Sequence, residues 1–306
     1  TCALPISAGK IATNNRGKVI GISIKDRGAI LPAGHKADAA YWYDGGNEGK
    51  WISSTFYMEE LPKWVQKVNE THNSNKYLNE TWETMLPIKS YVESIADNNP
   101  YEGTFNEEEA PVFPHDLKAL RDSNHNYSLI KATPFGNTIL KELALAAIEG
   151  ENLGDDEFTD FLAVSFSSPD YIGHKYGPMS IEIEDTYLRL DKDLAEILTY
   201  LENKFGDDEV LIFLTADHGA VNVPQYLIDN NLPAGYFDQA KMIADLKSHL
   251  KKSFNTDTLV ASVSNYQVFL HHDYIAQNKL GLEVVEREVS QFLLKQKGIS
   301  KAITAT

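Results

Sequence analysis

The pair Asp217–His218 follows the apolar run 210–214 (VLIFL) and precedes Gly219. A carboxylate oxygen beside an imidazole nitrogen is a ligand combination suited to zinc. The continuous, β-branched-rich run predicts a strand buried on both faces of a parallel sheet. Open α/β sheets bind their ligands at the carboxyl ends of such strands. Alone, the pair is weak evidence, because most such pairs are capping or surface residues, so its interpretation depends on what lies beside it.

A second carboxylate and imidazole, Asp170 and His174, follow the apolar run 161–167. The segment 181–204 has a strong helical apolar period and links this run to the one before Asp217. Strand, helix and strand in this order predict a βαβ unit of a parallel sheet. Because neighbouring parallel strands end at the same edge, we expect both Asp-His pairs to share one site.

Lys25 and Arg27 follow a third apolar run, 18–24, in a turn that contains Gly28. Two cations in such a turn are suited to a phosphate or sulfate, which arginine binds bidentately. An ordinary solvated turn is the alternative interpretation. Together, metal ligands facing an anion clamp indicate metal-assisted phosphoryl or sulfuryl transfer.

Two other groups of polar residues are weaker candidates. His35 and Asp38 have helical spacing, but we expect them in a loop and helix start, with 41–43 packing against the sheet. His271, His272 and Asp273 follow a predicted strand region, where such residues usually form a turn, and nothing near them completes a ligand set.

Strand and helix patterns alternate along the chain, which predicts an α/β fold with a parallel sheet. Further helices are expected at 57–69, 138–149, 225–229, 239–253 and 282–295, and strands at 51–55 and 260–270. The region of about 70–130 has no sustained period and predicts a loop-rich insertion. We expect a single domain over 1–306, with about 225–300 as a second peripheral segment.

The composition limits the classes of partner. The chain of 306 residues has a formal net charge of −16, which disfavours nucleic acids and anionic membranes because both require basic patches. No apolar run is long enough to cross a membrane, and no signal-peptide pattern is present. The single cysteine, Cys2, excludes an internal disulfide framework and a thiolate metal cluster. An anionic substrate would require a local positive centre.

These motifs resemble those of the alkaline phosphatase superfamily of binuclear zinc hydrolases. The likeness lies in Ser168–His174 (SPDYIGH) and Thr215–Gly219 (TADHG). Ser23–Pro32 (SIKDRGAILP) and Ala39–Asp44 (AAYWYD) are closer still to the phosphate-irrepressible, PafA-type alkaline phosphatases. The similarity extends over about 11–237. It implies a three-layer α/β/α fold with a mostly parallel central sheet.

The resemblance also assigns roles to six side chains: two ligands for each of two zinc ions, and two contacts to the nonbridging phosphate oxygens. These are Asp170 and His174 for one zinc ion, Asp217 and His218 for the other, and Lys25 and Arg27 for the phosphate. In that family a threonine nucleophile forms a phosphoenzyme, which water then resolves. The implied substrates are small-molecule phosphate monoesters, and the implied protein is a monomer, periplasmic or secreted.

The family's threonine nucleophile and an aspartate ligand lie before the Lys-Asp-Arg segment, and its last histidine ligand lies in a His-Gly motif near the carboxyl terminus. Neither motif has a match here, so no catalytic nucleophile is identified and we expect a fragment lacking both ends, inactive alone. One alternative is a phosphodiesterase of the same superfamily; Lys25 and Arg27 favour monoesters, which carry more negative charge. The other is an incomplete domain that only binds metal or anion. The absence of the Cys/Ser modification motif disfavours a sulfatase.

Overall fold

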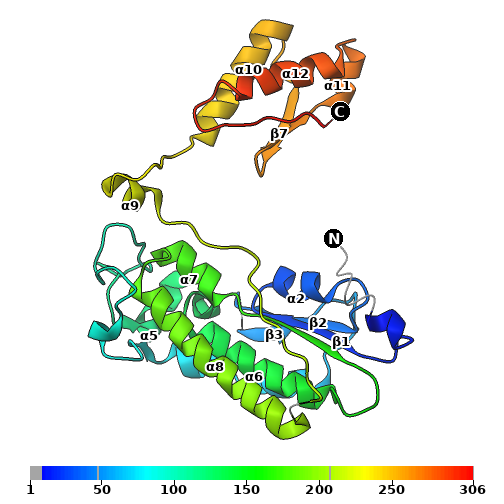
Figure 1. Ribbon diagram of the computed structural model, residues 1–306, viewed down its shortest axis with the longest axis vertical. Coiled ribbons are helices and arrows are strands. Elements are labelled where there is room, and N and C mark those ends of the chain that lie inside the picture. The colour runs from blue at the N-terminus through cyan, green and yellow to red at the C-terminus, as the bar shows by residue number, and fades with distance from the viewer. Residues whose placement is uncertain (1–8, 47, 207, 306) are drawn as a thin grey trace. The chain divides into compact units, whose positions relative to one another are not determined.

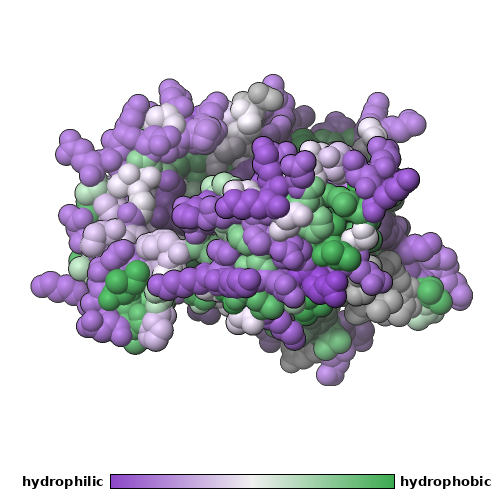
Figure 2. Space-filling model, turned by 90° about the horizontal axis from the view of Figure 1, so that it is seen from above, coloured by the Kyte–Doolittle hydropathy of each residue, from purple (hydrophilic) through white to green (hydrophobic). Residues whose placement is uncertain are grey.

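The structure is a computed structural model that describes residues 9–46, 48–206 and 208–305, so that Cys2 lies outside it. The chain divides into two compact units, Thr1–Leu227 and Ile228–Thr306, each described here by itself. Hydrophilic side chains dominate the face shown in Figure 2, as the net charge of −16 leads one to expect, and hydrophobic residues form scattered patches.

The first unit is built on a four-stranded sheet with the order β3-β2-β1-β6. Strands β1 (Val19–Ser23), β2 (Ala39–Asp44) and β6 (Phe161–Ser165) run parallel, and β3 (Lys50–Ile52) pairs antiparallel with β2. All five residues of β1 are buried, as a continuous apolar run in a central parallel strand predicts. The carboxyl ends of the three parallel strands therefore meet at one edge.

Helices cover both faces of this sheet (Figure 1). Helix α2 (Asp26–Ala33) lies on one face, and α6 (Phe135–Gly150) lies on the other with α3 (Lys63–Glu70) and α8 (Ile181–Phe205) beside it. A Cβ atom at Gly21 would come within 2.1 Å of the Ala29 carbonyl oxygen, so only glycine allows α2 to lie this close to β1. The result is the expected three-layer α/β/α arrangement.

The region of about 70–130 is loop-rich, as predicted, and contains only short elements. They are α4 (Asn73–Leu78), β4 (Thr81–Trp82), η1 (Ile88–Ser90), β5 (His115–Asp116), α5 (Leu117–Leu120), η2 (Asp122–Asn124) and η3 (Asn126–Ala132). The buried carboxylate of Asp185 in α8 joins this region to the helical layer. It accepts hydrogen bonds from Trp82 Nε1 at 2.8 Å and from the Tyr91 hydroxyl at 2.5 Å.

Two predicted elements differ in the structure. Ala39–Asp44 is strand β2 rather than a helix start, because its first residues pair with β1 and are buried there. Asp38 is structural: its carboxylate accepts a hydrogen bond from Val19 N at 2.7 Å. The helix expected over 57–69 begins only at Lys63, because the residue before Pro62 is disfavoured in the helical conformation.

The predicted strand Val210–Leu214 is wrong. The run is extended and passes β6, where the Phe213 ring lies 6.2 Å from that of Phe161, yet no ladder pairs it among the residues that the structure describes (Figure 1). Leu211 is 89% exposed and Leu214 is 80% exposed. A strand of this composition requires a covering layer on each face. No helix in the described parts of the chain supplies those layers, so the run stays in water.

The second unit has its own hydrophobic core. Helices α10 (Gln239–Phe254), α11 (His272–Gln277) and α12 (Leu282–Leu293) belong to it, with the antiparallel hairpin of β7 (Val260–Ser264) and β8 (Gln267–Leu270). Its buried apolar residues are Met242, Leu246, Leu250, Leu259, Val260, Ile275, Val285 and Val289. The short helix α9 (Pro224–Asp229) spans the division between the units. The assignment of both units to one larger domain stays a prediction.

The structure of the second unit accounts for His271 and His272, which were weaker candidates for metal ligands. His271 and His272 stand at the start of α11, so the segment forms a helix start after a strand. The described residues contain no group of three or more His, Cys, Asp or Glu side chains placed to hold a metal ion. Nor does any helix described in the structure combine the length and apolar character needed to span a membrane.

Candidate active site

Three serines fix the carboxyl ends of β1 and β6 to each other. The Ser23 hydroxyl donates to the Ser165 carbonyl oxygen at 2.9 Å and lies 3.2 Å from the Ser167 hydroxyl. The same Ser23 oxygen accepts a hydrogen bond from the backbone N–H of Lys25 at 3.1 Å. A Cβ at Gly28 would lie 2.5 Å from this oxygen, so the glycine lets the first turn of α2 approach the serines. The turn with the two cations is thereby positioned.

Helix α7 (Ser168–Tyr176) presents the first pair of predicted metal ligands. Its buried residues Ser168, Ile172 and Tyr176 recur every four positions and face the core. Asp170 and His174 recur with the same spacing on the opposite side of the helix, which leaves them accessible. The distance between His174 Nε2 and Asp170 Oδ1 is 3.3 Å. Two atoms that coordinate one tetrahedral zinc ion at about 2.0–2.1 Å lie about 3.3 Å apart, so this pair has the spacing of half a zinc site.

Lys25 meets Asp170 across the sheet edge. Its ammonium forms an ion pair with Asp170 Oδ2 and lies 4.4 Å from the centroid of the Tyr171 ring. Partial burial raises the pKa of Asp170, but the hydrogen bond and charge of Lys25 outweigh it, so that the pKa lies below its ordinary value. Residues after β1 and after β6 are thus brought together, as the parallel arrangement predicted.

Asp217 and His218 lie in the exposed segment that follows the 210–214 run. His218 Nε2 is 3.7 Å from Asp217 Oδ2, and His218 Nδ1 is 3.0 Å from the Gly219 carbonyl oxygen. The Gly219 carbonyl and then the Asp217 charge raise the pKa of His218; Asp170 adds to this rise and Lys25 opposes it. The structure therefore brings His218 into electrostatic range of the first pair, but holds the second pair only loosely.

Arg27 stands in the exposed first turn of α2. Its backbone N–H donates to the Asp26 carboxylate at 2.7 Å. Among the residues that the structure describes, its guanidinium makes no ion pair. The side chain is available to an anion that approaches the edge of the sheet.

Lys131 is a third cation at this edge, and sequence analysis missed it. It lies in η3, and its ammonium is 5.9 Å from the centroid of the Tyr43 ring. Burial lowers its pKa; the charges of Asp44 and Asp26 oppose this, while Lys25 adds to the lowering. A single lysine in a loop-rich region has no spacing that would single it out, so the sequence carried no signal for it.

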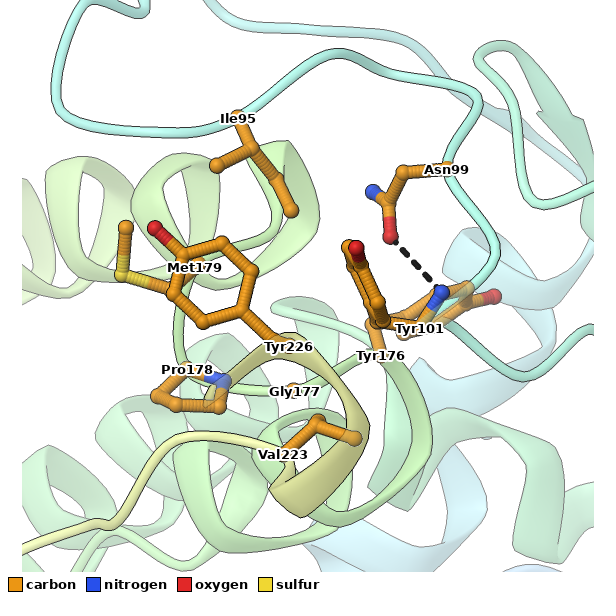
Figure 3. Close-up of a pocket in the computed structure, with 9 residues that line it drawn as sticks. All are labelled: Ile95, Asn99, Tyr101, Tyr176, Gly177, Pro178, Met179, Val223 and Tyr226. Carbon is orange, nitrogen blue, oxygen red and sulfur yellow. Dashed lines mark hydrogen bonds between the residues drawn. The ribbon is translucent and has the colours of Figure 1, made fainter. Parts of the chain in front are cut away.

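A small hollow lies at the other end of α7 and takes no part in this arrangement. It is lined by Ile95, Asn99, Tyr101, Tyr176, Gly177, Pro178, Met179, Val223 and Tyr226 (Figure 3). The Asn99 side-chain oxygen already accepts a hydrogen bond from Tyr101 N at 3.0 Å, and its amide nitrogen donates to the Ala96 carbonyl oxygen at 2.9 Å. Three of the nine lining residues are tyrosines and most of the others are apolar, so the hollow offers a largely apolar surface.

The donor set at the sheet edge fits zinc. Carboxylate oxygens and imidazole nitrogens are both zinc ligands, and Asp170 and His174 have the required spacing. Lys25, Arg27 and Lys131 supply the positive charge that an anion needs in a chain of net charge −16. This edge can hold a metal ion and an anion together.

Comparison with known proteins gives three results. A model of the family described as "Type I phosphodiesterase / nucleotide pyrophosphatase" matches residues 15–304. The chain is 48% identical over 293 residues to a protein of Myroides odoratus described as a calcium-transporting ATPase, covering 95% of this chain and 53% of that protein. It is 46% identical over 294 residues to alkaline phosphatase PhoV of Synechococcus elongatus, covering 96% of this chain and 52% of that protein.

A solved structure agrees with these sequence matches. The crystal structure of wild-type alkaline phosphatase PafA superposes with a TM-score of 0.92 at 40% identity, covering 98% of this chain and 57% of that one. The likeness confirms the predicted fold class. The chain spans about half the length of the curated relatives it matches.

Proposed function

Because the chain belongs to the type I phosphodiesterase / nucleotide pyrophosphatase family of the alkaline phosphatase superfamily, we propose that it carries the central part of a zinc-dependent phosphomonoesterase site. The observation that carries the proposal is the meeting of Lys25 with the Asp170–His174 pair at the carboxyl edge of the sheet. The relative named alkaline phosphatase PhoV and the PafA structure support hydrolysis of phosphate esters.

In the proposed site, Asp170 and His174 hold one zinc ion, and Asp217 and His218 hold the other. When bound, zinc supplies a Lewis acid for the apical oxygens of an in-line displacement. Arg27 binds nonbridging oxygens of the phosphoryl group bidentately, and the Lys25 ammonium adds a point charge to the same group.

The proposed reaction proceeds through a phospho-Thr in the complete enzyme. No residue of this chain is assigned as the nucleophile. The role of the chain's own residues is therefore to bind and orient the phosphoryl group and to neutralise its equatorial charge. The protein is proposed to act as a monomer in the periplasm or outside the cell, without nucleic-acid or membrane partners.

The cations at the sheet edge favour phosphate monoesters over diesters as the proposed substrates. A phosphate monoester dianion exposes one more charged nonbridging oxygen than a diester, so it gains more from a cluster of cations. Lys25, Arg27 and the partly buried Lys131 concentrate such charge at the sheet edge. A phosphodiesterase of the same superfamily is the alternative, and equal or faster turnover of a diester by the complete enzyme would establish it.

A direct test compares the 306-residue chain with the complete enzyme. We expect the chain alone to bind zinc but to show little or no hydrolysis of p-nitrophenyl phosphate, and the complete enzyme to prefer it over bis-p-nitrophenyl phosphate. Metal removal from the complete enzyme by a chelator should abolish turnover, and zinc should restore it. Strong zinc-dependent hydrolysis by the chain alone would reveal a nucleophile within these residues.

A further inference from the structure

Both oxygens of the Asp170 carboxylate are already engaged. Oδ2 is ion-paired with the Lys25 ammonium, and Oδ1 lies 3.3 Å from His174 Nε2. The Lys25 side chain is 28% exposed and that of Asp170 is 32% exposed, so this pair is only partly screened by water. The oxygen that Lys25 contacts belongs to the same carboxylate that is proposed to coordinate zinc.

Zinc and the Lys25 ammonium are positive charges that compete for this carboxylate. A divalent ion at Asp170 and His174 would neutralise Asp170 and repel the ammonium across a few ångströms. Lysine carries its charge on a flexible four-carbon stem, so the ammonium is able to swing without movement of the backbone. The backbone of Lys25 is fixed by its hydrogen bond to Ser23 at 3.1 Å.

We propose that Lys25 alternates between two anions: it neutralises Asp170 when no metal ion is bound there, and zinc binding releases it to the substrate phosphate. This inference rests on the proposed function. The centroid of the Tyr171 ring lies 4.4 Å from the Lys25 ammonium, and this cation–π interaction stabilises the Lys25 side chain beside Asp170.

The exchange couples the two ligands. When phosphate binds the Lys25 ammonium, the ammonium no longer competes with zinc for Asp170. When zinc binds Asp170, the ammonium is free to contact phosphate. By linkage, each ligand must raise the affinity for the other by the same factor. Arg27, whose guanidinium makes no ion pair among the described residues, gives no such coupling because it has no carboxylate to leave.

The test is calorimetric titration of the 306-residue chain with zinc alone, with inorganic phosphate alone, and with each in the presence of the other. We expect phosphate to tighten zinc binding, and zinc to tighten phosphate binding, by the same factor of at least about fivefold. Lys25→Met should bind zinc at least about fivefold more tightly than wild type, and phosphate should raise its zinc affinity by a smaller factor than it does in wild type.

Two variants separate competition from simple loss of positive charge. Arg27→Met and Lys131→Met each remove a cation of the same edge that forms no ion pair with Asp170, so zinc affinity should change less than about twofold. If Lys25→Met changes zinc affinity no more than these controls, or if phosphate leaves zinc affinity unchanged, the exchange is overturned.

Asp170→Asn distinguishes this failure from failure of the proposed function. If Asp170→Asn binds one zinc ion fewer than wild type while Lys25→Met behaves as its controls, the zinc site stands and only the exchange is wrong. If Asp170→Asn binds zinc as wild type does, or if wild type binds none, the proposed zinc site falls and the exchange falls with it. Far-ultraviolet circular dichroism of each variant checks that the fold is retained.

Discussion

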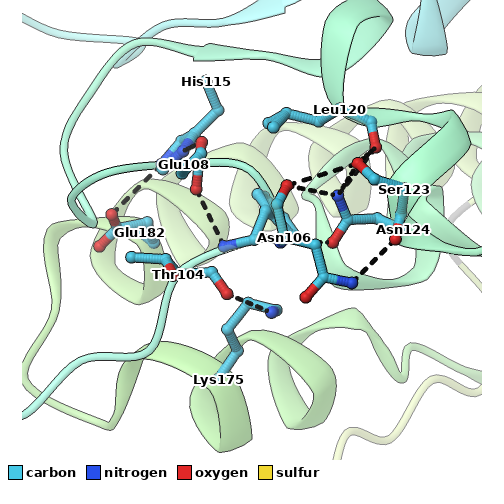
Figure 4. A network of polar contacts seen from close by, with 10 residues as sticks. Thr104, Asn106, Glu108, His115, Leu120, Ser123, Asn124, Lys175 and Glu182 are labelled. Atoms are coloured by element: carbon cyan, nitrogen blue, oxygen red, sulfur yellow. Dashed lines mark hydrogen bonds and ion pairs between the residues drawn. The ribbon is translucent and has the colours of Figure 1, made fainter.

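Two groups of carboxylates and imidazoles in the first unit differ in burial and therefore in order. His115 is fully buried between two glutamates: its Nδ1 lies 2.7 Å from Glu108 Oε1 and its Nε2 lies 3.3 Å from Glu182 Oε1 (Figure 4). In contrast, the side chains of Asp217 and His218 are 91% and 66% exposed. We call the first group the His115 cluster and the second the exposed pair.

Burial gives the His115 cluster strongly shifted titrations. Burial lowers the pKa of His115, but its hydrogen bonds to Glu108 and Glu182 outweigh this and raise the pKa to about 9. Nearby, burial and the charge of Glu182 raise the pKa of Glu102 to about 8, against the lowering effect of the Asn99 amide. The cluster therefore holds its protons at neutral pH and joins the loop-rich insertion to α8.

The comparison teaches that the group whose polar side chains are held more firmly is also the group that a ligand can reach less easily. The His115 cluster is fixed because both ring nitrogens of the buried His115 have a carboxylate partner, so it serves the fold. The exposed pair is loosely held because water competes for its groups, and so its donor atoms remain accessible to a metal ion. Four predictions test this difference, from the largest expected effect to the smallest.

His115→Leu should destabilise the chain by about 3–5 kcal/mol, because it leaves Glu108 and Glu182 buried without their cationic partner. The matched change in the exposed pair, His218→Leu, should alter the free energy of unfolding by no more than about 0.5 kcal/mol. Urea denaturation followed by circular dichroism measures both. Similar losses in the two variants would remove the distinction between the groups.

Arg27→Ala should impair hydrolysis while leaving the stability of the fold almost unchanged. In the complete enzyme we expect monoester hydrolysis to fall about 100-fold, since a bidentate contact to the transition state is lost, and diester hydrolysis to fall much less. The unfolding midpoint should hardly move, because the guanidinium makes no ion pair within the described residues. Equal losses on the two substrates would contradict the clamp role.

The stability of the chain should fall as the pH rises from about 6.5 to 9. The folded pKa of His115, about 9, exceeds its unfolded value of 6.5, so its contribution is full below 6.5 and is lost as the pH passes 9. The pKa of Glu102 is about 8 in the folded chain and 4.5 in the unfolded chain, so Glu102 also lowers the stability as the pH rises through this range. Denaturation at pH 6.5 and 9 should show a smaller decline in Glu102→Gln than in wild type, whereas a decline of the same size would exclude Glu102.

Leu211→Ser should have the smallest effect on stability, within about 0.5 kcal/mol, because the side chain is already 89% exposed. The same change at the buried Leu143 of α6 provides the contrast and should cost at least about 3 kcal/mol. Thermal unfolding of the two variants measures this difference. A large loss for Leu211→Ser would mean that the 210–214 run is buried in solution.

Sequence analysis predicted the elements whose pattern is strong and local. Strands β1 and β6 were found because continuous apolar runs mark buried parallel strands, and α8 because its apolar period extends over 25 residues. The meeting of Lys25 with Asp170 followed from the rule that parallel strands end at one edge. That rule requires only the order of elements, which the sequence displays.

The failures have physical causes as well. Ala39–Asp44 combines small and aromatic residues, which suit a helix start and a strand equally, and only pairing with β1 decides between them. The 210–214 run has the composition of a strand, but the parts of the chain that the structure describes do not supply the covering layers that such a strand requires. The His115 cluster joins residues 108, 115 and 182, and no spacing rule connects positions so distant in the chain.

The spacing of Asp170 and His174 has a consequence for the order in which the two proposed zinc ions would bind. Both side chains stand on one nine-residue helix, so their separation is set as soon as α7 forms and needs no contact from the rest of the chain. Asp217 and His218 belong to a segment that no ladder pairs among the described residues, so a metal ion at the proposed second site would have to order that segment on arrival. Binding at Asp217 and His218 therefore costs more conformational entropy than binding at Asp170 and His174, and a metal ion at α7 is expected to bind first.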